Sequence, residues 1–70
     1  MKYLVIIEKT STGFSAYSPD LEGCAATGST KLEVESLIKE AIEFHLEGLR
    51  EEGYEIPDSH SYSNYLEVMA

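Results

Sequence analysis

The stretch TKLEVESLIKEAIEFHLEGLREEG, residues 30–53, is the longest periodic segment of this 70-residue chain and predicts a single helix. Thr30 and Glu33 have the spacing of a capping box, in which two side chains satisfy free amides at a helix start. Gly53 suits the position that follows the last helical turn. We therefore expect a helix over residues 31–52. Its apolar side recurs every three or four positions and comprises Val34, Leu37, Ile38, Ala41, Ile42, His45 and Leu49.

Two strands that form a hairpin are expected before the helix. Residues 2–9, KYLVIIEK, are rich in β-branched and aromatic residues and too few for a buried helix, which predicts a buried strand. Residues 14–18, FSAYS, alternate apolar and polar side chains, as a half-buried strand does. Gly13 lies between the two segments and supplies the tight turn that joins antiparallel strands.

Two more strands complete the expected sheet. Pro19 and Asp20 turn the chain after the hairpin, and the small residues 23–28, GCAATG, predict a closely covered third strand. A polar loop over residues 53–63 leads to YLEVMA at residues 64–69, whose alternation predicts a short fourth strand. The order β-β-β-α-β predicts an α+β fold. An antiparallel meander carries the helix on one face, and the last strand lies beside the first. This order resembles the opening of a ribonuclease-H-like fold.

Composition limits the partners and the location of the chain, which we expect to fold as a single domain over residues 1–70. Its 5 basic and 13 acidic residues give a formal net charge of −8. This charge opposes binding to nucleic acid and favours a basic protein partner. A core of this size rarely supplies more than about 3–5 kcal/mol, so we expect oligomers. Five apolar residues, Tyr3 to Ile7, are too few for a signal peptide or a membrane span. With one cysteine, a cytoplasmic location is expected.

One cysteine and two histidines raise the question of an active or metal site. Cys24 could act as a nucleophile with His45 as its base, or both could belong to the core. The histidines lack the spacing of a metal site. Glu8 and Glu67 are too few for the carboxylate cluster of a ribonuclease-H-like nuclease. Residues 23–30 lack the lysine of a phosphate-binding loop. We expect no metal, cofactor or small-molecule substrate, while a thiol enzyme using Cys24 and His45 stays open.

The stretch SPDLEGCAATGST, residues 18–30, resembles the motif P-D-L-P-G-C-x-x-x-G-(D/S)-T of the HicB-like antitoxins. The matching residues are Pro19, Asp20, Leu21, Gly23, Cys24, Gly28 and Thr30. Glu22 stands where the family more often has proline. The resemblance continues in residues 40–53, EAIEFHLEGLREEG, and in Ile56-Pro57, so it covers nearly the whole chain. It implies a partial ribonuclease-H-like fold that is not an enzyme.

The resemblance also implies a partner. HicB-like antitoxins bind a small basic HicA toxin, a ribonuclease with a double-stranded-RNA-binding-domain-like fold and an essential histidine, and cover its active site. They form homodimers or homotetramers. Many carry a C-terminal DNA-binding module that is not expected here, because the last predicted strand ends next to Ala70. The alternative is an orphan HicB-like domain that oligomerises or regulates another protein. The acids that we expect to face a partner are Asp20, Glu22, Glu40, Glu43 and Glu47.

Overall fold

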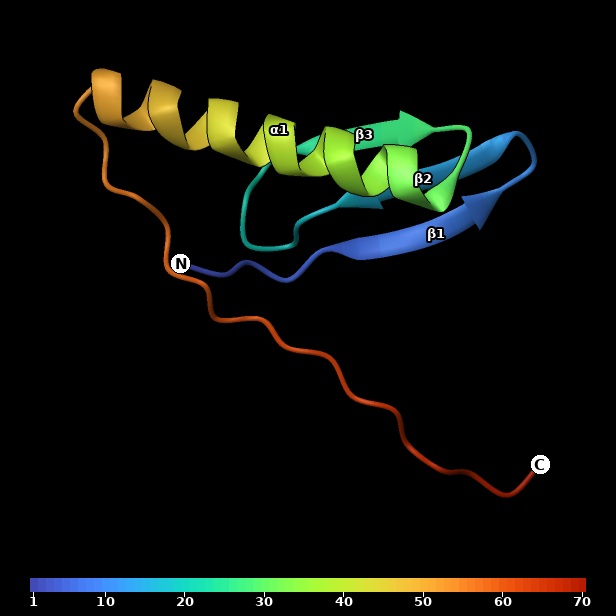
Figure 1. Ribbon diagram of the computed structural model, residues 1–70. Helices are drawn as coiled ribbons and strands as arrows, with labels where there is room; N and C mark the ends of the chain where they lie inside the picture. Colours follow the sequence, from blue (N-terminus) through green and yellow to red (C-terminus); the bar gives the residue numbers. More distant parts are fainter.

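A three-stranded antiparallel sheet with one helix across one face makes up the protein (Figure 1). The computed structural model describes residues 1–70. The elements follow the order β1 (Ile6–Thr10), β2 (Gly13–Tyr17), β3 (Ala25–Gly28) and α1 (Lys31–Glu51). The strands lie in the order β1-β2-β3, so β2 is central and β1 and β3 are the edges. The predicted α+β class, with an antiparallel meander and one covering helix, is confirmed.

Small residues allow α1 to lie close to the sheet. Ala16 of β2 pairs with Ala26 of β3 and is buried beneath the helix. Gly28 ends β3 so near the helix start that an added Cβ would lie 2.9 Å from the backbone nitrogen of Val34. Gly13 has a φ of +153°, and an added Cβ there would collide with the carbonyl oxygen of Gly28. The glycines and alanines of the sheet therefore set the distance between its strands and the helix.

The helix begins at the predicted cap. Thr30 has extended backbone angles, and its side-chain oxygen accepts a hydrogen bond of 3.1 Å from the amide of Glu33. The Glu33 carboxylate in turn accepts a bond of 2.8 Å from the amide of Ser29. The two side chains thus satisfy amides at the helix start in the manner of a capping box, with the glutamate reaching one residue further back.

The helix ends in a Schellman motif. Gly53, with a φ of +76°, donates its amide to the carbonyl of Arg50 at 3.1 Å. The amide of Tyr54 donates to the carbonyl of Leu49 at 2.9 Å. These two bonds satisfy carbonyls that the last turn leaves free. The helix over Lys31–Glu51 matches the predicted range of 31–52 to within one residue.

The buried core lies between α1, the sheet and the loop that joins β2 to β3. It comprises Ala16, Leu21, Cys24, Val34, Ile38 and Leu46. The structure corrects two predictions about which residues of the helix are buried. Leu37, expected in the core, is 39% exposed on the flank of the helix, whereas Leu46, left out of the expected face, is buried. The covered stripe follows Val34, Ile38 and Ile42 toward Leu46, because the last turns lie over the N-terminal segment instead of over the strands.

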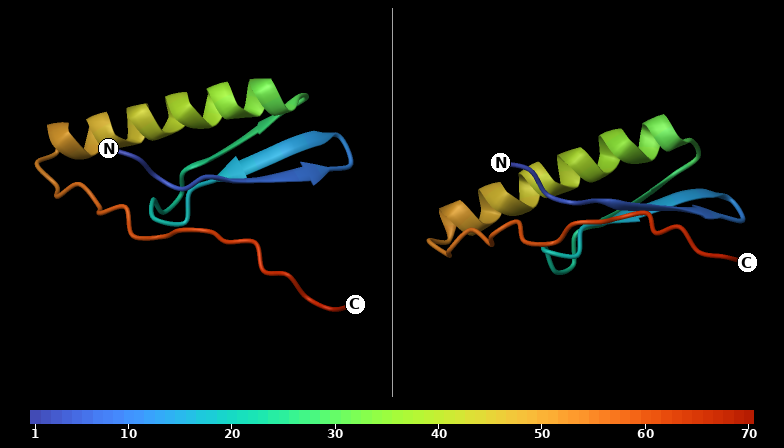
Figure 2. Two further views of the ribbon diagram at one scale, coloured as in Figure 1. Left: turned by 60° about the horizontal axis from the view of Figure 1, so that its bottom comes forward. Right: turned by 90° about the horizontal axis from the view of Figure 1, so that it is seen from below.

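The predicted fourth strand over residues 64–69 is not formed. Residues 54–70, here called the tail, make no strand. Figure 1 and the left view of Figure 2 show the end of the tail diverging from the sheet. An alternating pattern satisfies only the side-chain requirement of a strand, since the backbone also needs a neighbour to bond to. The first strand is likewise shorter than the predicted 2–9, because its partner β2 ends at Tyr17, opposite Ile6. The third strand begins at Ala25 instead of residue 23.

Candidate functional site

The loop between β2 and β3, residues 18–24, is closed by its own backbone. The amide of Leu21 donates to the carbonyl of Ser18 at 3.2 Å, and the amide of Cys24 donates to the carbonyl of Leu21 at 3.3 Å. Gly23 has a φ of +77°, which a residue with a side chain rarely adopts. The Leu21 side chain points inward and is almost completely buried. This loop therefore holds its remaining side chains in fixed positions.

Asp20 is the most heavily bonded side chain of this loop. One carboxylate oxygen accepts hydrogen bonds from the amides of His60 and Ser61, each at 3.0 Å. The other accepts a bond of 2.6 Å from the Ser61 hydroxyl and lies 3.2 Å from Nε2 of His60. The side chain is fully buried under these groups. Asp20, expected on the partner-facing rim, thus binds the chain's own tail.

The surroundings of Asp20 favour its charged form. The hydrogen bond from the Ser61 hydroxyl has the largest effect and lowers the pKa of Asp20 below its ordinary value. Burial opposes this effect, whereas the amides of Ser61 and His60 and the charge of a protonated His60 add to it. A second hydrogen bond joins the tail to the N-terminal segment, since the Tyr3 hydroxyl donates to the carbonyl of Pro57. The tail is therefore attached to the fold over residues 57–61.

The other four expected partner acids are exposed. Glu40, Glu43 and Glu47 follow one another at spacings of three and four residues on α1, so they share one face of the helix. Glu22 lies on a different element, in the loop over residues 18–24. Three of the predicted acids therefore lie together on one surface of α1, here called the acidic helix face. Glu22 does not belong to this surface, because it lies in the loop.

Cys24 and His45 line the same surface hollow, which has a volume of about 540 Å³. No hydrogen bond joins them, and the Cys24 thiol is buried. This burial raises the pKa of the Cys24 thiol. A nucleophilic cysteine needs the opposite shift, because the thiolate is the reactive form. The environment of Cys24 thus corresponds to a core cysteine. No group of three or more His, Cys, Asp or Glu residues is placed to hold a metal ion.

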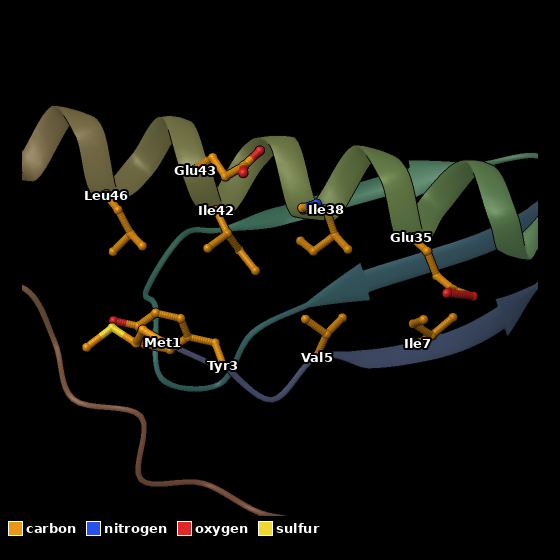
Figure 3. A pocket seen from close by; sticks show the side chains of 10 residues that line it. Met1, Tyr3, Val5, Ile7, Glu35, Ile38, Ile42, Glu43 and Leu46 are labelled. Carbon is orange, nitrogen blue, oxygen red and sulfur yellow. The ribbon is translucent and has the colours of Figure 1, made fainter.

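An apolar groove of about 420 Å³ lies between the N-terminal segment and the underside of α1 (Figure 3). We call it the β1–α1 groove. One wall carries Met1, Tyr3, Val5 and Ile7, and the other carries Ile38, Ile42 and Leu46. Figure 3 shows the two sets pointing toward one another. Glu35, Lys39 and Glu43 also line it from the helix. No helix in the structure has the length and apolar character needed to cross a membrane.

The sequence matches a known protein family and two known relatives. The family described as HicB_like antitoxin of bacterial toxin-antitoxin system matches residues 3–69. The chain belongs to the HicB-like antitoxin family. Two relatives of this HicB-like chain show how the similarity extends. The UPF0150 protein Ta0767 of Thermoplasma acidophilum is 43% identical over 58 residues, which cover 81% of this chain and 84% of that protein. A 14.9 kDa protein from the rep-hol intergenic region of Haemophilus phage HP1 is 39% identical over 66 residues, covering 94% of this chain and 50% of the phage protein.

Two solved structures share the fold of this HicB-like chain. A chain of the HicA3 and HicB3 toxin-antitoxin complex superposes with a TM-score of 0.67 at 38% identity, covering 79% of this chain and 64% of that one. The HicB3 antitoxin superposes with a TM-score of 0.68, also at 38% identity, covering 80% of this chain and 41% of the antitoxin. This chain thus spans less than two thirds of both solved chains, and about half of the phage relative.

His60 and Ser61 were not predicted as the partners of Asp20. Some 40 residues separate them from it. The only available signal was the polar run Asp58-Ser59-His60-Ser61 after Pro57, in which amides and a hydroxyl stand close together. Such a run is typical of a solvated loop, so it does not by itself reveal a distant carboxylate.

Proposed function

We propose that this chain is the antitoxin of a HicA/HicB-type pair and neutralises a small basic mRNA-cleaving toxin by direct protein contact. The observation that carries the proposal is the match, at 38% identity and a TM-score of 0.67, to a chain of the HicA3 and HicB3 complex. The protein acts as a binding partner in the cytoplasm, not as an enzyme. It works as a homodimer or homotetramer and does not bind nucleic acid directly.

Charge supports a basic partner. A net charge of −8 on 70 residues attracts a protein that is itself built to bind RNA phosphates. We infer that the acidic helix face, formed by Glu40, Glu43 and Glu47, contacts this toxin. Its carboxylates are exposed and can occupy positions where the toxin otherwise holds phosphate oxygens. Glu22 is a second contact. The contribution of Asp20 is indirect, because its oxygens are occupied by the tail.

Co-expression tests the proposal. The antitoxin role requires a neighbouring gene for a small basic protein with a central histidine, and the chain is produced together with the product of that gene. We expect growth to be rescued and the two proteins to purify together. Failure of both results would contradict the antitoxin role and favour an orphan domain that regulates another protein.

Charge reversal tests the surface. The variant Glu40→Lys/Glu43→Lys/Glu47→Lys is expected to lose most of its affinity for the toxin. The matched control is Glu8→Lys/Glu55→Lys/Glu67→Lys, which alters net charge equally at three exposed acids that lie outside α1. If only total charge mattered, both variants would weaken binding alike, and the acidic helix face would not be the contact. Retention of the helical circular dichroism signal in both variants excludes unfolding.

A further inference from the structure

The surface hollow that contains Cys24 and His45 has features that the fold itself does not use. It has a volume of about 540 Å³ and lies between α1 and the start of β3, so it is here called the α1–β3 hollow. Phe44 and Gly48 line it from the helix, and Cys24 and its small neighbours line it from the sheet. Tyr54, just beyond the end of the helix, also lines it.

Two aromatic rings of this hollow are exposed to water. Phe44 is 70% exposed and Tyr54 is 65% exposed, although phenylalanine is among the residue types that are most often buried. Neither ring belongs to the buried core or packs against it. Exposed apolar area that gathers on one surface is typical of a contact site.

Gly48 leaves space beside these rings. Glycine within a helix lowers its stability, since alanine loses less conformational freedom on folding. A Cβ added at Gly48 would meet no atom within 4 Å, so the packing of the chain does not require a glycine there. Phe44 lies one turn earlier on the same side of α1. The missing side chain therefore enlarges the hollow next to the Phe44 ring.

The charge of the hollow determines which kind of side chain it can hold. Glu51 and Glu52 line it, whereas no lysine or arginine does. The only ion pair of the structure joins His60 to Asp20, so both glutamates lack a cationic partner. His45 is the one lining side chain that can become positive. Carboxylates beside aromatic rings repel an anion and attract a cation.

We propose that the α1–β3 hollow binds an arginine side chain of a basic protein partner. The guanidinium lies against the rings of Phe44 and Tyr54 and donates to the carboxylates of Glu51 and Glu52. A guanidinium is flat, so it can stack on a ring while its N–H groups reach carboxylates in its plane. The compact ammonium of lysine lacks this combination. The inference rests on the proposed function only for the identity of the partner, which is then the toxin.

The α1–β3 hollow adjoins the acidic helix face. Glu51 lies one turn after Glu47, so the two carboxylates are neighbours on the surface of α1. A single basic protein can therefore contact the acidic helix face and insert one arginine into the hollow. The carboxylates attract the partner by charge, and the rings select the shape of the inserted group.

Titration with N-acetylarginine amide tests the site on the chain alone. Proton–nitrogen nuclear magnetic resonance follows the backbone amides of Phe44, Gly48 and Tyr54, whose signals are expected to shift to saturation. The matched probe is N-acetylcitrulline amide, which has nearly the same shape without the charge and is expected to cause no saturable shift. Equal shifts with both probes, or saturable shifts confined to other parts of the chain, would overturn the proposal.

Three variants test the contacts within the hollow. Phe44→Ala is expected to weaken binding of the arginine probe about two- to fivefold, the effect of a cation–π contact at an exposed site. Gly48→Leu fills the space beside Phe44 and is expected to abolish the shifts without lowering the thermal midpoint. The control Tyr65→Ala removes a fully exposed ring of the tail and is expected to bind the probe like the unaltered chain. Unweakened binding by Phe44→Ala would contradict the proposal.

Toxin binding distinguishes this inference from the antitoxin role. Phe44→Ala/Tyr54→Ala is expected to weaken the affinity for the toxin by more than about fivefold, while Tyr65→Ala leaves it unchanged. An unchanged affinity in the double variant would overturn the proposal and leave the antitoxin role intact. If the unaltered chain binds the arginine probe in the hollow but binds no toxin, the antitoxin role fails and the arginine site stands.

Discussion

The adjacent residues Leu37 and Ile38 give the sharpest test of how α1 packs. Both belong to the apolar pattern of the sequence, yet Ile38 is 3% exposed and Leu37 is 39% exposed. Truncating Ile38 to alanine removes three buried carbons, worth roughly 2.4 kcal/mol at about 0.8 kcal/mol per methylene. The cavity left behind raises the cost within the usual range of about 2–5 kcal/mol. For Leu37→Ala we expect less than about 1 kcal/mol, because alanine is also the better helix former.

Urea denaturation followed by far-ultraviolet circular dichroism measures both costs at equal protein concentration. A core of this size rarely supplies more than about 3–5 kcal/mol, so Ile38→Ala is expected to lose at least about half of the free energy of unfolding. Ile38→Val then provides a graded value, expected at about 0.5–1.5 kcal/mol. If Leu37→Ala lowered the free energy of unfolding as much as Ile38→Ala, the helix would face the sheet in the orientation that the sequence alone predicts.

Three further outcomes follow from the cap, the tail attachment and the buried thiol. Thr30→Ala is expected to lose about 1 kcal/mol of stability in urea while Thr30→Ser keeps most of it, because serine retains the accepting oxygen; equal losses would contradict the cap. The lowered pKa of Asp20 contributes stability that is complete above its ordinary value and is lost as the pH falls through the lowered one. The urea midpoints of the unaltered chain and Asp20→Asn should therefore converge in acid. At neutral pH the variant should lose hydrogen-exchange protection at the amides of His60 and Ser61, and unchanged protection would refute the attachment. Cys24 should react slowly with iodoacetamide at neutral pH and faster in urea; rapid labelling of the folded chain would indicate an activated thiolate.

Local chemistry made the helix and the hairpin predictable from the sequence. The cap at Thr30, the stop at Gly53 and the turn at Gly13 each depend on residues within a few positions. The class of the fold follows from these signals, because one amphipathic helix needs a sheet to cover. The structure has the helix and the hairpin where these local signals predict them, and no contact with a distant segment overrides the signals.

The remaining features depend on contacts between distant segments. The tail has the alternation of a strand, but the pattern does not specify whether a neighbour is available. Leu46 is buried and Leu37 is exposed because of where the N-terminal segment passes under the helix, which the helical pattern does not specify. Asp20 was expected among the partner-facing acids because it lies in the turn that Pro19 holds rigid. Its binding to His60 and Ser61 requires the three-dimensional path of the tail.

Inhibition of the toxin in a purified system tests the central claim most directly. The product of a neighbouring gene for a small basic protein is assayed for RNA cleavage while the chain is added in increasing amounts. Cleavage is expected to cease when the two proteins are equimolar, and to continue when Glu40→Lys/Glu43→Lys/Glu47→Lys replaces the unaltered chain. Undiminished RNA cleavage in the presence of a large excess of folded chain would contradict the antitoxin function.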